Sequence, residues 1–191
     1  MGKVVVSEFM TVDGVMEDPG GAEQFDRGGW AFKFERGPEG DKFKLDEVMA
    51  AEALLLGRET YEGFAQAWPS RTDEVGFAEK MNSMPKYVVS TTLQNPEWDN
   101  STVISENVPQ RVSELRDRAG GDVLVYGSAQ LSQWLTRKKL VDEYRLMVFP
   151  VVLGAGKRLF ADTPEAEALQ LTDSRTVGAG ITILIYRPAA S

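Results

Sequence analysis

The chain passes twice from a short apolar run through a glycine into a stretch of helical composition. The first junction is LLLGRETYE at residues 54–62, and the second is VLVYGSAQL at residues 123–131. Uninterrupted apolar runs of this kind fill strands that are covered on both faces, and strands joined through a crossover helix pair in parallel. The repeated order of strand, crossover and strand therefore predicts an α/β domain with a largely parallel sheet.

The other segments extend this pattern. Strands are expected at residues 3–10, 54–56, 86–91, 102–105 and 142–153, helices at 41–51, 59–67, 73–81 and 109–119, and a strand followed by a helix within 122–135. Residues 169–187 predict a β-hairpin that turns near residues 178–180, and this antiparallel pair makes the sheet mixed. A length of 191 residues fits one domain, residues 1–191.

A long irregular stretch, residues 18–40, is rich in glycine but also contains Phe25, Trp30, Phe32 and Phe34. Glycine and proline interrupt regular structure there, and the aromatic residues are unusual for a polar linker. Two interpretations have equal weight. The stretch covers or lines a ligand site, or it is a hydrophobic loop packed on the core.

The chain contains neither histidine nor cysteine. Their absence excludes catalytic triads that use histidine, thiolate nucleophiles, disulfides, and metal sites built from imidazole or thiolate, so no metal is expected. Acid–base chemistry would have to use a carboxyl, lysine, tyrosine, water or a bound cofactor. This composition favours a reaction whose reactive group is carried by a cofactor.

The net charge of −8, with no basic run, argues against nucleic acid as a partner. The first ten residues, MGKVVVSEFM, contain a serine and a glutamate too early for a signal peptide, and no segment is long and apolar enough for a membrane span. We therefore expect a soluble, cytoplasmic protein with a small-molecule substrate and no membrane partner.

Three predicted strands end in small or hydroxyl residues. Ligands of open α/β sheets bind outside the carboxyl ends of parallel strands, and helix N-termini that follow glycine turns bind phosphate. The residues expected at such a site are Gly57, Arg58, Thr60, Ser90, Thr91, Gly127 and Ser128. The segment VVSTT has no acidic residue for ribose hydroxyls, which favours NADP over NAD. For the first segment taken alone, an ordinary turn at Gly57, with Arg58 solvated and Thr60 merely near the helix start, is the favoured interpretation.

Together the segments SEFMTVDG, GRETYE, KYVVSTTL, VLVYGSAQL and FPVVLGAGKRLF resemble the dihydrofolate reductase-like fold over nearly the whole chain. The chain is most similar to stand-alone relatives of the RibD C-terminal domain, the reductase domain of the bifunctional riboflavin-biosynthesis enzyme. This resemblance implies a three-layer αβα fold, NADPH as cofactor, and 5-amino-6-(5-phosphoribosylamino)uracil reductase-like activity. It also implies that the seven strand-end residues hold the NADPH phosphates.

Some motifs of these related proteins differ here. The late junction has Gly127 followed by serine and alanine, where dihydrofolate reductase itself usually has consecutive glycines. The substrate segment T-V-x-x-D-N-P-x-L is replaced by YEGFAQAWPSRTDE, and the dihydrofolate reductase pattern W-x-x-P-x-D lacks its proline between Trp30 and Glu35. The substrate therefore stays open among pterin-like, aminopyrimidine-like and sugar-linked compounds.

Hydride transfer to a C=N or C=O bond needs a nearby proton donor. The candidates are Asp13, Asp26 and Glu35; Asp13 follows the first strand, and burial among aromatic residues would raise the pKa of Glu35. A plain turn for the Asp-Gly pair and a solvated Glu35 are the alternatives. Met16 and Trp30 are candidates for the substrate wall, with core packing as the alternative.

Lys157 and Arg158, in the segment GAGKRLF, are candidates for binding a substrate phosphate, with a solvated loop as the default. The sequence as a whole predicts an NADPH-dependent reductase and allows a homodimer through its carboxyl-terminal strands. A nucleotide-binding sensor or regulatory module that has lost turnover is the alternative function.

Overall fold

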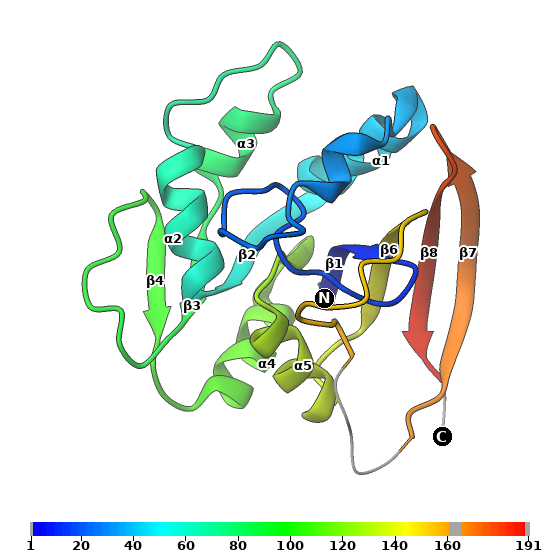
Figure 1. The fold of residues 1–191 in the computed structure, drawn as a ribbon. Helices are drawn as coiled ribbons and strands as arrows, with labels where there is room; N and C mark the ends of the chain where they lie inside the picture. The colour runs from blue at the N-terminus through cyan, green and yellow to red at the C-terminus, as the bar shows by residue number, and fades with distance from the viewer. Residues whose placement is uncertain (1, 161–165, 190–191) are drawn as a thin grey trace.

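The computed structural model describes residues 2–160 and 166–189. Within them, eight strands form one sheet in the order β4-β3-β2-β5-β1-β6-β8-β7 (Figure 1). The strands are β1 (Val4–Thr11), β2 (Ala51–Gly57), β3 (Lys86–Val89), β4 (Ser101–Ile104), β5 (Asp122–Val125), β6 (Glu143–Phe149), β7 (Leu169–Val177) and β8 (Ile181–Pro188). All pairs from β4 to β6 are parallel, whereas β8 pairs antiparallel with both β6 and β7. The predicted mixed, mostly parallel sheet with a carboxyl-terminal hairpin is confirmed.

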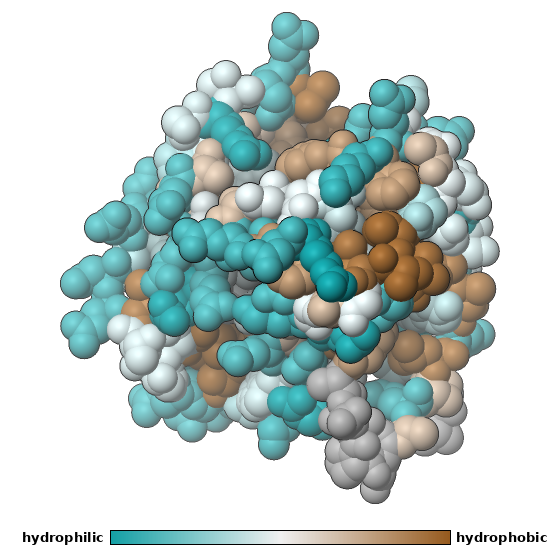
Figure 2. All heavy atoms as spheres, viewed as in Figure 1, coloured by the Kyte–Doolittle hydropathy of each residue, from teal (hydrophilic) through white to brown (hydrophobic). Residues whose placement is uncertain are grey.

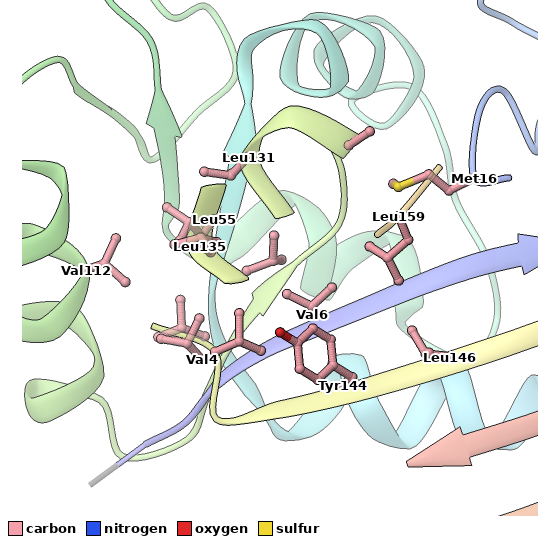
Figure 3. Close-up of a cluster of buried hydrophobic side chains, with 14 of the residues drawn as sticks. Val4, Val6, Met16, Leu55, Val112, Leu131, Leu135, Tyr144, Leu146 and Leu159 are labelled. Carbon is pink, nitrogen blue, oxygen red and sulfur yellow. The ribbon is translucent and has the colours of Figure 1, made fainter. Parts of the chain in front are cut away.

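Helices cover both faces of the sheet. They are α1 (Gly37–Ala50), α2 (Arg58–Ala67), α3 (Phe77–Ser83), α4 (Val108–Arg118) and α5 (Ala129–Arg137), with the 3-10 helix η1 (Trp30–Lys33) before α1. One apolar cluster joins α1, α2 and α3 to the sheet through Val48, Tyr61 and Met81. A second cluster, on the other face, joins α4 and α5 to it through Val112, Leu131 and Leu135 (Figure 3). The two groups of helices and the sheet between them form the predicted αβα layers.

The strand β1 occupies the middle of the sheet because it pairs with both β5 and β6. Its side chains alternate between the two helical layers, as the period of a strand requires. Ser7 contacts Glu47 of α1, whereas the next residue, Glu8, contacts Ser132 of α5. The strand thus places one polar side chain in each layer near its carboxyl end.

Several element boundaries differ from the sequence-based expectation. The helix expected at residues 73–81 is α3, which starts at Phe77, because both carboxylate oxygens of Asp73 accept backbone N–H groups from residues 75–78 and hold a loop there. The long strand expected at residues 142–153 stops at Phe149 as β6, directly before Pro150, which has no N–H for a ladder.

The aromatic stretch at residues 18–40 is partly a core element. Trp30 is fully buried, and its ring meets Phe149 of β6 edge-on with centroids 5.3 Å apart. Phe32, two residues later, is 82% exposed. Packing on the core, one of the two interpretations, therefore describes Trp30 but not Phe32. No helix in the described part of the chain is long and apolar enough to cross a membrane.

Candidate functional site

The carboxyl ends of β3, β2, β5 and β1 lie next to one another along one edge of the sheet. Gly57 of β2 lies opposite Val89 of β3, and β2 and β1 both pair in parallel with β5. This pairing brings the three predicted segments, residues 57–60, 90–91 and 127–128, to the same edge.

The two glycine turns touch each other. A β-carbon built on Gly57 would overlap the Oγ of Ser128 and lie 3.0 Å from its Cβ. A β-carbon on Gly127 would lie 2.5 Å from the Oγ1 of Thr60, and Gly127 has a φ of 63°, in the left-handed region. Larger side chains are therefore excluded at both glycines, and the turns form one continuous backbone surface.

Both α2 and α5 begin at this surface. Gly57 is the N-cap of α2, and Ser128 is the N-cap of α5, where its Oγ accepts the Leu131 N–H at 3.3 Å. The first amides of a helix lack intrahelical acceptors, and the helix dipole makes this end positive. Two such ends with Arg58 in the first turn of α2 form a surface suited to phosphate.

Side chains next to the turns supply a cation and a hydroxyl. The Arg58 side chain is 42% exposed and lies with its Nη1 3.0 Å from the Oε2 of Glu62, one turn along α2. Ser90, directly after β3, uses its Oγ to accept the Leu93 N–H at 3.0 Å, and Thr91 is exposed. Arg58 and Thr91 are thus accessible to a ligand at this edge.

The loop after β6 brings two further cations close by. The Nζ of Lys157 lies 3.5 Å from the Oε2 of Glu59, in the first turn of α2, and 3.7 Å from the Oε1 of Glu17. The Arg158 Nε donates to the carbonyl of Asp13 at 3.1 Å. Both candidates for a substrate phosphate are therefore engaged by oxygens of the protein itself.

Asp13 joins the turn after β1 to the loop after β6. Its Oδ1 accepts the Thr11 hydroxyl at 2.6 Å, and its Oδ2 accepts the Gly154 N–H at 2.7 Å. The Thr11 hydroxyl, followed by backbone amides, lowers the pKa of Asp13 to about 2, so this carboxyl is ionised at neutral pH. These contacts favour a structural role, and the proton-donor role of Asp13 stays a prediction without support from its surroundings.

The other two candidate acids, Asp26 and Glu35, are exposed. Glu35 contacts the carboxyl-terminal hairpin through its backbone, since its carbonyl accepts the Ala179 N–H at 2.8 Å. Of the two alternatives for Glu35, burial among aromatic residues is therefore not observed, and the solvated glutamate is. Trp30 turns into the core, whereas Glu35, like Phe32, stays at the surface.

Met16 and Trp30, the candidates for the substrate wall, are core residues. Trp30 is 0% exposed, and its Nε1 donates to the Glu17 carbonyl at 2.9 Å. Met16 is 7% exposed and belongs to the cluster that contains Leu159 (Figure 3). Core packing, the alternative interpretation from the sequence, describes both residues.

The sequence interpretation missed Glu8, which lies directly under the second glycine turn. Its Oε1 accepts the Gly127 N–H at 2.6 Å and the Ser132 hydroxyl at 3.3 Å. Burial raises the pKa of this carboxyl to about 8. The available signal was a glutamate inside the apolar strand KVVVSEFM, because a buried strand seldom carries a carboxyl without a partner.

A second buried polar group lies between β1 and α1, on the opposite face. The Lys44 Nζ donates to the Ser7 Oγ at 2.9 Å and to the Glu47 Oε1 at 2.5 Å, and the Tyr126 hydroxyl donates to the same oxygen at 2.8 Å. Burial alone would raise the pKa of Glu47, but the Lys44 charge and these hydrogen bonds outweigh it and lower the pKa. Tyr126 connects this group to the turn at Gly127 that follows it.

The surface around the strand ends is uneven in polarity. Figure 2 shows a mostly polar face with an apolar patch over the ends of β1 and β6. Val12 and Val152, which follow these strands, are 62% and 68% exposed. A hollow of about 400 Å³ lies elsewhere, at the amino ends of β2 and β5, and contains Glu52 and Gly120 but none of the predicted site residues.

Known proteins share both the sequence pattern and the fold. The chain is 30% identical over 188 residues to protein YyaP of Bacillus subtilis, a match that covers 96% of this chain and 94% of YyaP. The crystal structure of a putative riboflavin biosynthesis protein from Shewanella sp. PV-4 superposes with a TM-score of 0.77 at 20% identity and covers 98% of this chain and 99% of that one. A pyrimidine reductase-like protein from Corynebacterium diphtheriae superposes with a TM-score of 0.67 at 11% identity, covering 99% and 92%.

The expected resemblance to riboflavin-pathway reductase domains is thereby confirmed at the level of family and fold. The family profile of the RibD C-terminal domain matches residues 2–183, which include all the strand ends of the candidate site. This protein belongs to the RibD C-terminal domain family.

Proposed function

We propose that this protein is an NADPH-dependent reductase of a small heterocyclic substrate, of the aminopyrimidine or pterin class. Family membership supports a reductase of the riboflavin-pathway type with a nicotinamide cofactor. The similar fold of a pyrimidine reductase-like protein supports the aminopyrimidine class as the first to test.

The contact between the two glycine turns carries this proposal. The N-termini of α2 and α5 meet where Gly57 touches Ser128 and Gly127 touches Thr60. A backbone surface without side chains, with two positive helix ends, fits a pyrophosphate better than a neutral ligand, because each helix end favours one negative group.

Residues on the β3 side favour a dinucleotide with an additional phosphate. Arg58, which directly follows β2, has a partly exposed guanidinium, and Ser90 and Thr91 follow the neighbouring strand β3. A guanidinium binds phosphate through charge-assisted hydrogen bonds, whereas a carboxylate would be needed for free ribose hydroxyls. We assign these three residues to the adenosine 2′-phosphate, which makes NADPH the expected cofactor over NADH.

When bound, NADPH would supply the hydride. The protein itself has to bind the cofactor and the substrate, orient them, and exclude water from the site. The apolar side chains Val12 and Val152 border the same edge of the sheet on the β1 and β6 side. Such a border suits a flat heterocycle next to the phosphate-binding turns, since ligand sites combine apolar walls with a few polar groups.

The positions of the expected acids favour one alternative, a nucleotide-binding module without turnover. Asp13 is held in a structural contact as an anion, and Glu35 is exposed. If the protein binds NADPH but oxidises none of it in the presence of pterins, aminopyrimidines or carbonyl compounds, the alternative holds and the reductase proposal is wrong.

Calorimetry with NADPH tests the cofactor assignment. The Arg58→Ala variant should bind NADPH about tenfold or more weakly than wild type does. For NADH, which wild type should bind more weakly than NADPH, the affinities of variant and wild type should differ little. Arg111→Ala is the matched control because Arg111 is also a partly exposed helical arginine paired with a glutamate, but on α4. Equal affinity of wild type and Arg58→Ala for NADPH, or absence of binding by wild type, would refute the proposal.

A further inference from the structure

One carboxyl oxygen connects β1, the second glycine turn and α5. The Glu8 Oε1 accepts the Gly127 N–H at 2.6 Å and the Ser132 hydroxyl at 3.3 Å, and Glu8 is only 9% exposed. Neither contact belongs to the regular pairing of the sheet or to a helix. Glu8 is therefore placed to determine the position of the turn and not merely to fill the core.

Gly127 has little freedom apart from this bond. Its backbone lies in the left-handed region with a φ of 63°, and Thr60 occupies the space where a side chain would stand. With its own N–H directed to Glu8, Gly127 leaves the next amides, at the start of α5, for a ligand. The Glu8 carboxyl, by accepting the Gly127 N–H, thus leaves the amides after Gly127 to face the edge formed by the carboxyl ends of the strands.

We propose that Glu8 is a positioning residue of the dinucleotide site, whose carboxyl oxygen holds the Gly127 amide and thereby fixes the turn of residues 127–128 against the phosphates. This inference rests on the proposed function, because it takes a dinucleotide as the ligand of the turn. It adds to that proposal a residue that touches no ligand and acts through Gly127.

The protonation of Glu8 matters for such a role. Burial raises its pKa to about 8, while Lys44 across the sheet opposes this effect and Glu47 adds to it; Tyr126 is the other titratable group nearby. The carboxyl is therefore neutral at about pH 7 and accepts the amide without placing a negative charge under the phosphates. Above about pH 8 the ionised form repels them, so NADPH affinity should fall by up to about tenfold per pH unit.

Two substitutions separate the hydrogen bond from the charge. Glu8→Gln keeps an acceptor oxygen and cannot ionise, so it should bind NADPH within about twofold of wild type at neutral pH and lose the decline at alkaline pH. Glu8→Ala removes the acceptor and should bind about tenfold or more weakly. Glu143→Gln is the control, because Glu143 is a buried carboxyl at the amino end of β6, and it should keep the wild-type affinity and pH profile.

Some outcomes overturn the proposal. If Glu8→Ala binds NADPH as tightly as wild type, the hydrogen bond between Glu8 and Gly127 does not contribute to ligand binding. If Glu8→Gln binds as weakly as Glu8→Ala at neutral pH, a charge and not an acceptor is required. If Glu8→Gln keeps affinity but abolishes turnover, Glu8 takes part in the chemistry and is not a positioning residue.

A measurement without dinucleotide separates this proposal from the proposed function. The backbone amide resonance of Gly127 should shift with pH, with a midpoint near the raised pKa of Glu8, about 8, in wild type and not in Glu8→Gln. A Gly127 amide that does not respond to pH would overturn the hold by Glu8. A responsive amide in a protein that binds no NADPH would refute the proposed function and the ligand named here, and would leave the contact between Glu8 and the turn established.

Discussion

The side chain of Ser128 fills the place where a β-carbon on Gly57 would stand, with the Ser128 Cβ 3.0 Å from that position. These two residues cap different helices, α2 and α5; Gly57 ends β2, and Ser128 lies in the turn after β5. Their contact joins the two halves of the candidate phosphate site, so a change at one turn should displace the other.

Substitution of Gly57 by alanine should therefore destabilise the protein. The added methyl overlaps the Ser128 side chain and lies 3.2 Å from its backbone nitrogen, and overpacking of this kind costs about 1 to 3 kcal/mol. Denaturant unfolding of Gly57→Ala should show this loss, and adding Ser128→Gly should restore part of it, since glycine is tolerated at an N-cap.

The control for this change is Gly63→Ala. Gly63 lies inside α2, and a β-carbon there would meet nothing within 4 Å. Alanine in a helix interior is more favourable than glycine by about 0.5 to 1 kcal/mol, so this variant should gain stability. A Gly57→Ala protein as stable as Gly63→Ala would contradict the contact between the turns.

Asp13 should contribute to stability in a pH-dependent way. Its pKa is lowered from 3.8 to about 2 in the folded protein, so the folded state favours the anion. The contribution is then fully present above about pH 4 and is lost as the pH falls toward about 2. Asp13→Asn should be less stable than wild type by about 1 kcal/mol at neutral pH, because solvent screens this partly exposed group.

Unfolding curves of wild type and Asp13→Asn over this acid range check the sign. The difference in unfolding free energy should shrink as the solution is acidified. A difference that stays constant between neutral pH and about pH 2 would show that the Asp13 charge makes no contribution.

The buried pair of Lys44 and Glu47 should be sensitive to loss of one partner. Lys44→Met removes the nearer cation of the Glu47 carboxylate and leaves only the Arg145 Nη1 at 3.6 Å, so it should cost up to about 3 to 5 kcal/mol in denaturant unfolding. Lys42→Met, on the same helix, removes only an exposed pair with Asp46 and should cost less than about 1 kcal/mol. Similar losses for the two variants would mean that Lys44 is not effectively buried.

Trp30 should act as a core residue and not as a substrate wall. Trp30→Phe removes the hydrogen bond to the Glu17 carbonyl and part of the contact with Phe149, which should cost about 1 to 3 kcal/mol. NADPH affinity and the KM for a substrate should stay unchanged once the folded fraction is taken into account. An altered KM with normal stability would restore the sequence-based assignment.

Much of the fold was predictable because apolar periodicity reports burial directly. The runs at Leu54–Leu56 in LLLG and at Val123–Val125 in VLVY form adjacent parallel strands. The hairpin turns at residues 178–180, where the sequence predicted its turn. The convergence of the three strand ends followed from parallel pairing alone. Family membership then followed from motifs in a consistent order.

The candidate acids were harder to predict, because burial of a single side chain depends on the tertiary path of loops. Trp30 and Glu35 have the spacing of the dihydrofolate reductase pattern, yet Trp30 turns into the core and Glu35 stays exposed. Glu8 was overlooked because its partner, Gly127, lies 119 positions further along the chain, a distance that local patterns do not cover. The same limit applies to Lys44, whose partner Ser7 is 37 positions away.

The polar residues of β1 also explain how this strand finds its place. Val4, Val5 and Val6 are interchangeable in shape, so they alone would allow the strand to shift by one position. Such a shift would exchange Ser7 and Glu8 between the two helical layers and bring the Glu8 carboxyl toward the buried Glu47. The loss of an acceptor for the Gly127 N–H, and the burial of a second carboxyl beside Glu47, therefore disfavour the shifted alignment of the central strand.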